Sequence, residues 1–382
     1  MPQGITVNRS QLIAIVLFML IIFETAFGNT PLQNYNLIVN RIIFFIEVIL
    51  FAAFLSTEKY SKRILFFLRV VTVLFFCSYF ILNTSLLFRM FMMAMVVAKI
   101  GTTESFKIMF KFKTCIILLI IGLSLVGIIP NEYIVVEKGI GTTYGYGLGY
   151  THPNRLASAI CCAILCYIGW KKENCKNIDV VIICIVTGLS FYITKSRTLL
   201  YCISIYIICY ILFKIRFTKK IIKKSVFLVG LISVPLCISS SIIIPRLLLS
   251  SSGIVQKIVY AINLVFSRRF THIEHMFLAY SIPLIGGVFD TQLMNEMFAY
   301  SVVDNGYIRF LYEYGIIGLA FFGITSILSF IKLKKKKQYI WATIFIIVAI
   351  EGLLENIYVD IGLNLLVIFW GELIENKRKA IK

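Results

Sequence analysis

The chain has 382 residues, of which 59% are apolar and only 15% are charged, and its mean hydropathy is +0.91. These values lie far outside the usage of soluble globular domains. The formal net charge of +20 does not indicate a nucleic-acid-binding protein, because the basic residues fall in short runs between apolar stretches and form no continuous basic face.

Long apolar stretches predict an all-α, polytopic integral membrane protein of about twelve transmembrane helices, since a bilayer core about 30 Å thick needs about 20 apolar helical residues. We expect a single membrane domain over 1–382. The first span contains Glu24 and is expected to be an uncleaved helix rather than a signal peptide. In chain order the predicted spans are 11–27, 37–55, 64–82, 86–101, 114–130, 155–170, 180–194, 198–213, 226–244, 310–331, 339–355 and 357–373.

Basic residues gather in alternate loops, and loops rich in Lys and Arg stay in the cytosol. One such loop carries Lys107, Lys111 and Lys113. Both termini are therefore expected in the cytosol, and the long connections 131–154 and 245–309 on the extracytoplasmic side. The second of these should carry short helices, because 251–266 is apolar at helical spacing and suits a helix in the membrane surface, or alternatively a further buried helix.

Most of the ten cysteines lie inside apolar runs, and none forms a CxxC pair or a cluster with histidine at metal-ligand spacing. We expect packing residues rather than a disulfide framework or a metal site. The external carboxylates show no paired pattern that would hold a divalent ion, so no metal and no cofactor are predicted.

The first cluster of residues that could take part in chemistry ends a glycine-rich loop and opens a helix at Pro153. His152, Asn154 and Arg155 stand there, where the unpaired N–H groups of a helix start favour an anion. The alternative is an ordinary turn with a solvated histidine.

Thr194–Thr198 forms a very short connection between two apolar spans and contains Lys195 and Arg197. Cations on the extracytoplasmic side oppose the charge rule, so they imply an anionic partner such as a substrate phosphate. The alternative is that both side chains extend to lipid headgroups.

A third cluster, Ser267–His275, lies in the long 245–309 connection. If it is helical, Arg268, His272 and His275 share one polar stripe beside Arg269, which combines anion binding with groups that move protons near neutral pH. The alternative is that these residues form the solvent-facing side of an interfacial helix. Gly286 and Gly287 follow and permit a close backbone approach.

The fourth cluster opens the span at 310–331. Asp304 and Asn305 can cap the coming helix, Tyr307 follows, and Arg309 with Glu313 makes an i, i+4 pair. Capping alone would explain the first pair but not the number of polar residues.

Other charges lie within the spans, where they need partners or water. They can pair with one another or line a translocation path, which favours a transporter. They are Glu24, Arg41, Glu47, Arg69, Arg89, Lys99 and Glu351.

Four short segments in order resemble the O-antigen polymerase and ligase superfamily, in particular the Wzy-type polymerases of bacterial capsular polysaccharide and exopolysaccharide. They are Gly149–Asn154, Thr194–Thr198, Arg269 upstream of Leu284–Gly287, and Asp304–Tyr307 with Glu313–Gly318. The resemblance covers roughly the C-terminal two thirds of the chain. The double arginine leaves open whether Arg268 or Arg269 is the family's arginine.

The resemblance implies a polysaccharide polymerase in the bacterial cytoplasmic membrane. It would join polyprenyl-pyrophosphate-linked oligosaccharides at the outer face, with the lipid pyrophosphate leaving. Its partners would be these lipids, the bilayer, and a flippase and chain-length regulator, but no nucleic acid.

In that reaction arginines would hold the pyrophosphate, through Arg197 and through Arg268 or Arg269. His152, His275 or Asp304 would position or deprotonate the acceptor. The supporting residues would be Asn154, Arg155, Asn305, Tyr307 and Glu313.

Three other functions compete. A ligase of the same superfamily would move a finished glycan to another acceptor. A lipid-linked oligosaccharide flippase would belong to a different class, whose members usually show repeated halves and broken midplane helices that this sequence lacks. A structural scaffold would tolerate replacement of the external arginines.

Overall fold

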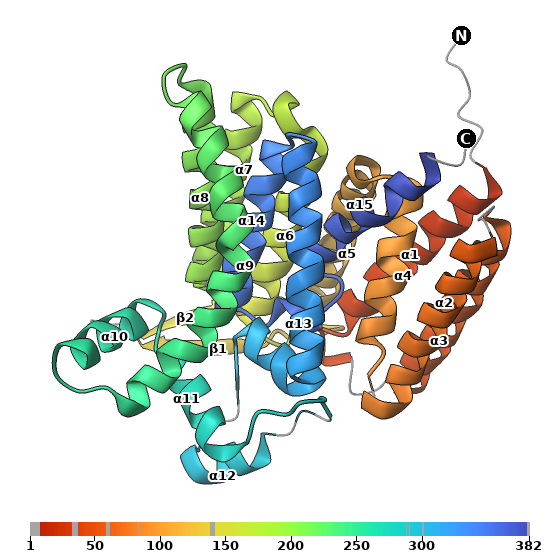
Figure 1. Cartoon of the computed structure of the whole chain (residues 1–382). Coiled ribbons are helices and arrows are strands. Elements are labelled where there is room, and N and C mark those ends of the chain that lie inside the picture. Colours follow the sequence, from red (N-terminus) through yellow and green to blue (C-terminus); the bar gives the residue numbers. More distant parts are fainter. Residues whose placement is uncertain are drawn as a thin grey trace. The chain divides into compact units, whose positions relative to one another are not determined.

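The computed structural model describes residues 8–32, 37–58, 62–82, 84–137, 142–287, 289, 291–299 and 302–379. Helices dominate these residues (Figure 1). The chain divides into two compact units. Unit 1 comprises Met1–Tyr79, Ser85–Ser204 and Ile361–Lys382, and unit 2 comprises Phe80–Thr84 and Ile205–Asp360. The expectation of one membrane domain over 1–382 stays a prediction.

Unit 1 is a helical bundle with one β-hairpin. In it α1 packs on α2, α4 and α5, while α6 packs on α5 and α7 and α15 packs on α4. Its elements are α1 (Arg9–Phe27), α2 (Leu37–Thr57), α3 (Lys62–Leu82) up to Tyr79, α4 (Leu86–Ile100), α5 (Thr102–Leu125), β1 (Tyr133–Glu137), β2 (Thr142–Tyr146), α6 (Pro153–Lys171), η2 (Lys172–Asn174), α7 (Asn177–Thr194), the start of α8 (Arg197–Lys214) and α15 (Leu366–Lys379).

Unit 2 contains the remaining helices, and the long α9 is its centre. α9 packs against α10, α11, α13 and α14, and α12 packs against α11. The elements after the end of α8 are α9 (Lys219–Ser250), α10 (Gly253–Val265), α11 (Arg269–Ala279), α12 (Gln292–Phe298), α13 (Gly306–Lys335), α14 (Tyr339–Leu354) and η3 (Ile357–Val359). Gly315 interrupts α13 with φ 71° and ψ −179°, so two helical pieces meet there.

Seven of the described helices are long and apolar enough to cross a membrane. They are α1, Val39–Thr57 of α2, α5, α7, α8, α9 and α13. The expectation of a helical membrane protein is confirmed in this coarse form. The count of about twelve spans and the sidedness of the connections stay predictions.

Two predicted boundaries are wrong. α5 begins at Thr102 rather than 114, so Lys107, Lys111 and Lys113 lie within a helix. Lys113 is buried there, and its Nζ donates to the Gly362 carbonyl oxygen at 2.6 Å. The expected span at 357–373 is also not one helix, since η3 and irregular backbone precede α15.

The 245–309 connection does carry short helices, α10 to α12, as expected. It is shorter than predicted, because α9 continues to Ser250 and α13 already begins at Gly306. The β1–β2 hairpin in the other long connection was not predicted. Its strands are antiparallel, with Tyr133 opposite Tyr146, and the Tyr133 ring contacts Tyr144 and Tyr146 at 5.9 and 6.5 Å between centroids.

Candidate functional site

Asn263 of α10 fixes the start of α11, the helix that carries the third cluster. Its Oδ1 accepts from the Phe270 N–H at 3.1 Å, and its Nδ2 donates to Thr271 Oγ1 at 2.7 Å. Its carbonyl oxygen accepts from the Arg268 N–H at 2.8 Å. Ser267 and Arg268 turn the chain with φ of 55° and 60°. This buried asparagine therefore satisfies donors that the first turn of α11 would leave unpaired.

The two adjacent arginines occupy different environments. Arg268 is exposed and precedes the helix. Arg269 is the first residue of α11, and its Nη2 lies 2.8 Å from Oε1 of Glu355, which follows α14 directly. Both of these side chains are largely buried. A guanidinium held by one carboxylate keeps other N–H groups in a fixed orientation, which suits recognition of a phosphate.

His272 and His275 follow Arg269 on successive turns of α11, with ring centroids 6.3 Å apart. The two histidines of the predicted stripe are thus helical as expected, but its third member, Arg268, precedes the helix with φ 60°. Burial, and then repulsion from His275 and Arg269, lowers the pKa of His272 below its ordinary 6.5, against attraction from Asp304. Burial likewise lowers the pKa of His275. Both rings are therefore neutral at pH 7 and able to accept a proton.

His275 is also packed against an aromatic ring. It stacks on Phe298 of α12 with centroids 4.0 Å apart and an interplanar angle of 5°. Its Nδ1 is buried and has no hydrogen-bond partner among the described residues. A buried ring nitrogen of this kind is a position where an ordered water molecule can bind.

At the start of α13, Asn305 caps the helix as expected, accepting from the Ile308 N–H at 2.9 Å. Its Nδ2 donates to Ser241 Oγ and to the Leu353 carbonyl oxygen. Tyr307 is buried and donates to the Ala349 carbonyl oxygen at 3.0 Å. These two residues tie α13 to α9 and α14 and have a structural role. Asp304 is half-buried and close enough for its charge to act on His272.

The expected i, i+4 pair is confirmed, because Arg309 Nε lies 2.7 Å from Glu313 Oε1. Beside it the 284–287 segment approaches α13 closely. A Cβ atom on Gly286 would lie 2.0 Å from the Glu313 carbonyl oxygen. At the break in α13, the Ile316 N–H donates to the Pro283 carbonyl oxygen and the Ile317 N–H to that of Leu284. Gly286 thus has the backbone role that the sequence predicted.

A pocket of about 280 Å³ lies between α11, the 280–289 segment and α13. Its aromatic walls are Tyr280, Phe289 and Tyr312. The Tyr312 hydroxyl donates to the Tyr280 carbonyl oxygen at 3.0 Å, and Arg309 lies over the Phe289 ring at 4.3 Å. Unit 2 thus combines cations, neutral histidines and an aromatic pocket.

In unit 1, His152 is the N-cap of α6, and its Nδ1 accepts from the Asn154 N–H at 3.1 Å. Asn154 and Arg155 are half-buried in the first turn. His152 therefore caps the helix, a role that neither interpretation of the sequence included. Arg197 opens α8 and is exposed.

The hairpin brings the glycine-rich connection and the Arg197 turn to the same end of unit 1. A Cβ on Gly145 of β2 would lie 2.7 Å from the Thr194 carbonyl oxygen, next to the turn at Lys195. Lys195 has φ 57° and lies over the Tyr192 ring at 4.5 Å.

Several charges inside the bundle of unit 1 pair with one another. Arg89 bridges Glu24 and Glu47, with both N–O distances 2.8 Å, and Lys99 pairs with Glu58 at 2.5 Å. Pairing satisfies these charges without a translocation path. It therefore weakens the observation that favoured a transporter.

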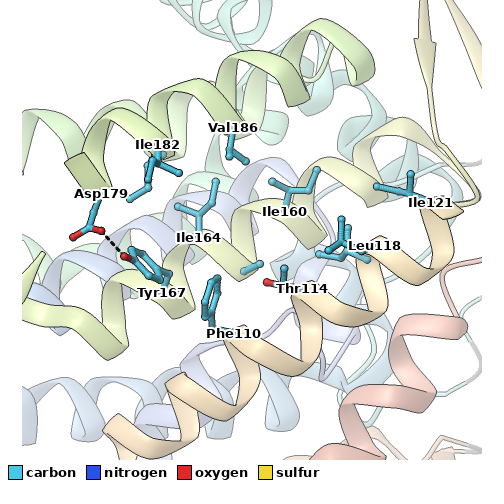
Figure 2. A pocket seen from close by; sticks show the side chains of 13 residues that line it. Phe110, Thr114, Leu118, Ile121, Ile160, Ile164, Tyr167, Asp179, Ile182 and Val186 are labelled. Atoms are coloured by element: carbon cyan, nitrogen blue, oxygen red, sulfur yellow. Dashed lines mark hydrogen bonds between the residues drawn. The ribbon is translucent and has the colours of Figure 1, made fainter. Parts of the chain in front are cut away.

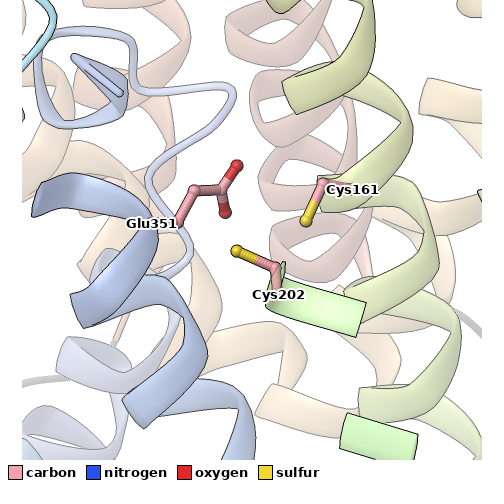
Figure 3. A group of neighbouring side chains, drawn as sticks. All are labelled: Cys161, Cys202 and Glu351. Carbon is pink, nitrogen blue, oxygen red and sulfur yellow. The ribbon is translucent and has the colours of Figure 1, made fainter. Parts of the chain in front are cut away.

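Two further features of unit 1 contain none of the predicted site residues. An apolar pocket of about 520 Å³ lies between α5, α6 and α7, with a Tyr167–Asp179 hydrogen bond of 2.6 Å at its edge (Figure 2). Cys161 of α6 and Cys202 of α8 are buried, with sulfur atoms within 4.8 Å of each other (Figure 3). Figure 3 also draws Glu351, a buried residue of α14 in unit 2.

Two functional residues were not predicted. Glu355 stands at the end of an apolar run, and an ionisable residue at that position is a signal that the sequence offered. Asn263 gave no such signal, because only the turn at Ser267 and Arg268 brings it to α11.

No model of a protein family matches the chain, and no curated protein or solved structure is detectably similar to it. The fold by itself defines a helical membrane protein.

Proposed function

We propose that the chain is a glycosyltransferase that polymerises polyprenyl-pyrophosphate-linked oligosaccharides at the outer face of a bacterial cytoplasmic membrane. One observation carries the proposal beyond the sequence resemblance. α11 carries Arg269, ion-paired with Glu355, and on its following turns two histidines whose pKa values are lowered. An arginine and a neutral base are the groups that this reaction needs.

In the proposed reaction the hydroxyl oxygen of the acceptor attacks the anomeric carbon of the donor. The bond from that carbon to the pyrophosphate oxygen breaks, and its electron pair stays on the pyrophosphate. The acceptor proton passes to the base. Arg269 would stabilise the developing charge, and the exposed Arg268 would contact phosphate from solvent. The exposed Arg197 of unit 1 is a separate candidate for phosphate binding.

His275 is the strongest candidate for the base. His152 already accepts a backbone hydrogen bond through Nδ1, whereas Nδ1 of His275 has no such partner among the described residues. Asp304 would act on His272 by its charge. A ligase would use the same groups, so the acceptor distinguishes it from a polymerase.

The test uses the purified full-length protein in nanodiscs with a synthetic lipid-linked repeat unit. The expected product is a ladder of lengthening glycans. Arg269→Ala and His275→Ala should each lower the rate at least about 100-fold. Lys257→Ala, which removes an exposed cation of neighbouring α10, is the matched control. Full activity in both site variants would contradict the proposal, and transfer only to a different acceptor would indicate a ligase.

A further inference from the structure

An apolar groove runs between α9 and α13 in unit 2, with a volume of about 530 Å³. Along α9 it extends from Val234 to Arg246, about 18 Å at 1.5 Å per residue, which is more than half of a bilayer core. Both helices are long and apolar enough to cross a membrane. A lipid chain could therefore lie along the groove without leaving the hydrocarbon region.

One end of this groove carries a positive charge. Arg246 is exposed and forms no ion pair with any described carboxylate. Its guanidinium lies 5.8 Å from the centre of the Phe277 ring of α11. A lipid whose chain fills the groove would place its phosphate at this arginine.

Many of the side chains that line the groove are branched and aliphatic. Ser239, Ala320 and Gly323 leave room between them, and a Cβ on Gly323 would be 3.4 Å from Ile238 Cδ1. The β-branched lining residues are Val234, Ile238, Ile242, Ile282, Ile316, Ile324 and Ile327. A surface of branched side chains can pack closely against the methyl branches of an isoprenoid chain.

The groove also adjoins the aromatic pocket of unit 2. Ile282 lines the groove, while its neighbours Ser281 and Pro283 line the pocket. Likewise, Leu311 of α13 lines the groove and the adjacent Tyr312 lines the pocket. A lipid with its phosphate at Arg246 would thus carry whatever is attached to the phosphate toward the pocket.

From these features we infer that the α9–α13 groove binds the chain of a polyprenyl pyrophosphate and that Arg246 binds its phosphate. This inference rests on the proposed function, since it assigns the lipid part of the same substrate. It adds Arg246 as a positioning residue.

The test measures binding rather than turnover. The full-length protein in nanodiscs is irradiated with a polyprenyl pyrophosphate that carries a diazirine in its chain, and the labelled peptides are identified. Labelling is expected on α9 and α13, saturable and competed by unlabelled polyprenyl pyrophosphate. Ala320→Trp should fill the groove, and Arg246→Gln should remove the phosphate contact. Each is expected to reduce labelling at least tenfold.

Two matched controls keep the test decisive. Leu328→Trp introduces the same side chain at an exposed site of α13 outside the groove, and Lys257→Gln removes another exposed cation. Both should label as the native protein does. Unchanged labelling in both groove variants would overturn the inference. Equal competition by phosphatidylglycerol would also overturn it, because the groove would then be an ordinary lipid contact.

Failure of the proposed function would look different. If the groove variants lose labelling but the native protein makes no glycan ladder, the lipid site stands and the polymerase proposal falls. If the native protein makes the ladder and the groove variants label and polymerise normally, the polymerase proposal stands and the lipid site falls.

Discussion

Arg269 and Glu355 show how one ion pair determines what a single side chain can do. The pair is largely buried, so removing its carboxylate leaves a guanidinium without its compensating charge. Glu355→Gln should lower the free energy of unfolding by about 2 kcal/mol and slow glycan formation about tenfold, since the arginine would lose its orientation. Thermal unfolding in detergent and the nanodisc assay measure the two effects.

The Arg309–Glu313 pair supplies the control for stability. Its N–O distance of 2.7 Å is similar, but it is a more exposed i, i+4 pair on one helix. Glu313→Gln should therefore change the free energy of unfolding by less than about 1 kcal/mol. An equal loss in the two variants would show that burial of the Arg269 pair has no special effect.

His275 makes the proposed chemistry sensitive to pH. Its pKa lies below the ordinary 6.5, so the ring becomes protonated at lower pH than an ordinary histidine does. A protonated ring cannot accept the acceptor proton, and activity should fall on that acid side. Phe298→Ala should expose the ring, raise its pKa and move the acid limb of the rate profile to higher pH. An unmoved limb would argue against His275 as the base.

At the residue scale, the sequence predicted which residues lie in the candidate site better than it predicted what each of them does there. The two histidines on successive turns of α11 and the Arg309–Glu313 pair follow from helical spacing, which is local. Arg268 does not share that helix, because the chain turns before Arg269. The Glu355 partner of Arg269 does not, because the two residues are far apart in the chain. The role of His152 as a helix cap could be read from its place before Pro153, but spacing alone could not choose between a cap and a catalytic residue.

Two neighbouring glycines give a sharp test of how the 284–287 segment packs on α13. A Cβ on Gly286 would collide with the backbone of Glu313 and Tyr314, whereas a Cβ on Gly287 would meet nothing within 4 Å. Gly286→Ala should lower the free energy of unfolding by about 1–3 kcal/mol, and Gly287→Ala should leave it nearly unchanged. Thermal unfolding compares the variants, and equal stability would show that the close approach does not hold in solution.

The joint between α10 and α11 is a second element-scale test. Asn263→Ala removes the acceptor for the Phe270 N–H and the donor to Thr271. It should destabilise the first turn of α11 by about 1–2 kcal/mol. Hydrogen exchange at the α11 amides should become faster, while the exposed Gln256→Ala on α10 should leave it unchanged. Unaltered exchange in Asn263→Ala would mean that other contacts fix this turn.

The elements themselves were predictable where hydropathy alone determines them. Long apolar helices such as α1, α7 and α8 lie within a few residues of their predicted spans. α5 differs because the buried Lys113 bonds to the Gly362 carbonyl oxygen, and no local rule anticipates a lysine satisfied inside a helical bundle. The hairpin was missed because its strands lie in a glycine-rich connection, where cross-strand tyrosine contacts form only after pairing.

At the scale of the whole molecule, the proposed chemistry depends on which side of the membrane the 251–305 segment faces. The alternation of basic loops predicts that it lies outside and that the start of α9 lies in the cytosol. Ser281→Cys should therefore react with an impermeant maleimide in intact cells, whereas Lys220→Cys should react only after permeabilisation; both positions are exposed. The parent protein corrects for its native thiols, of which Cys115 and Cys184 are exposed. If Ser281→Cys is labelled only from the cytosolic side, Arg269 and His275 cannot meet a lipid pyrophosphate at the outer face, and the polymerase proposal fails.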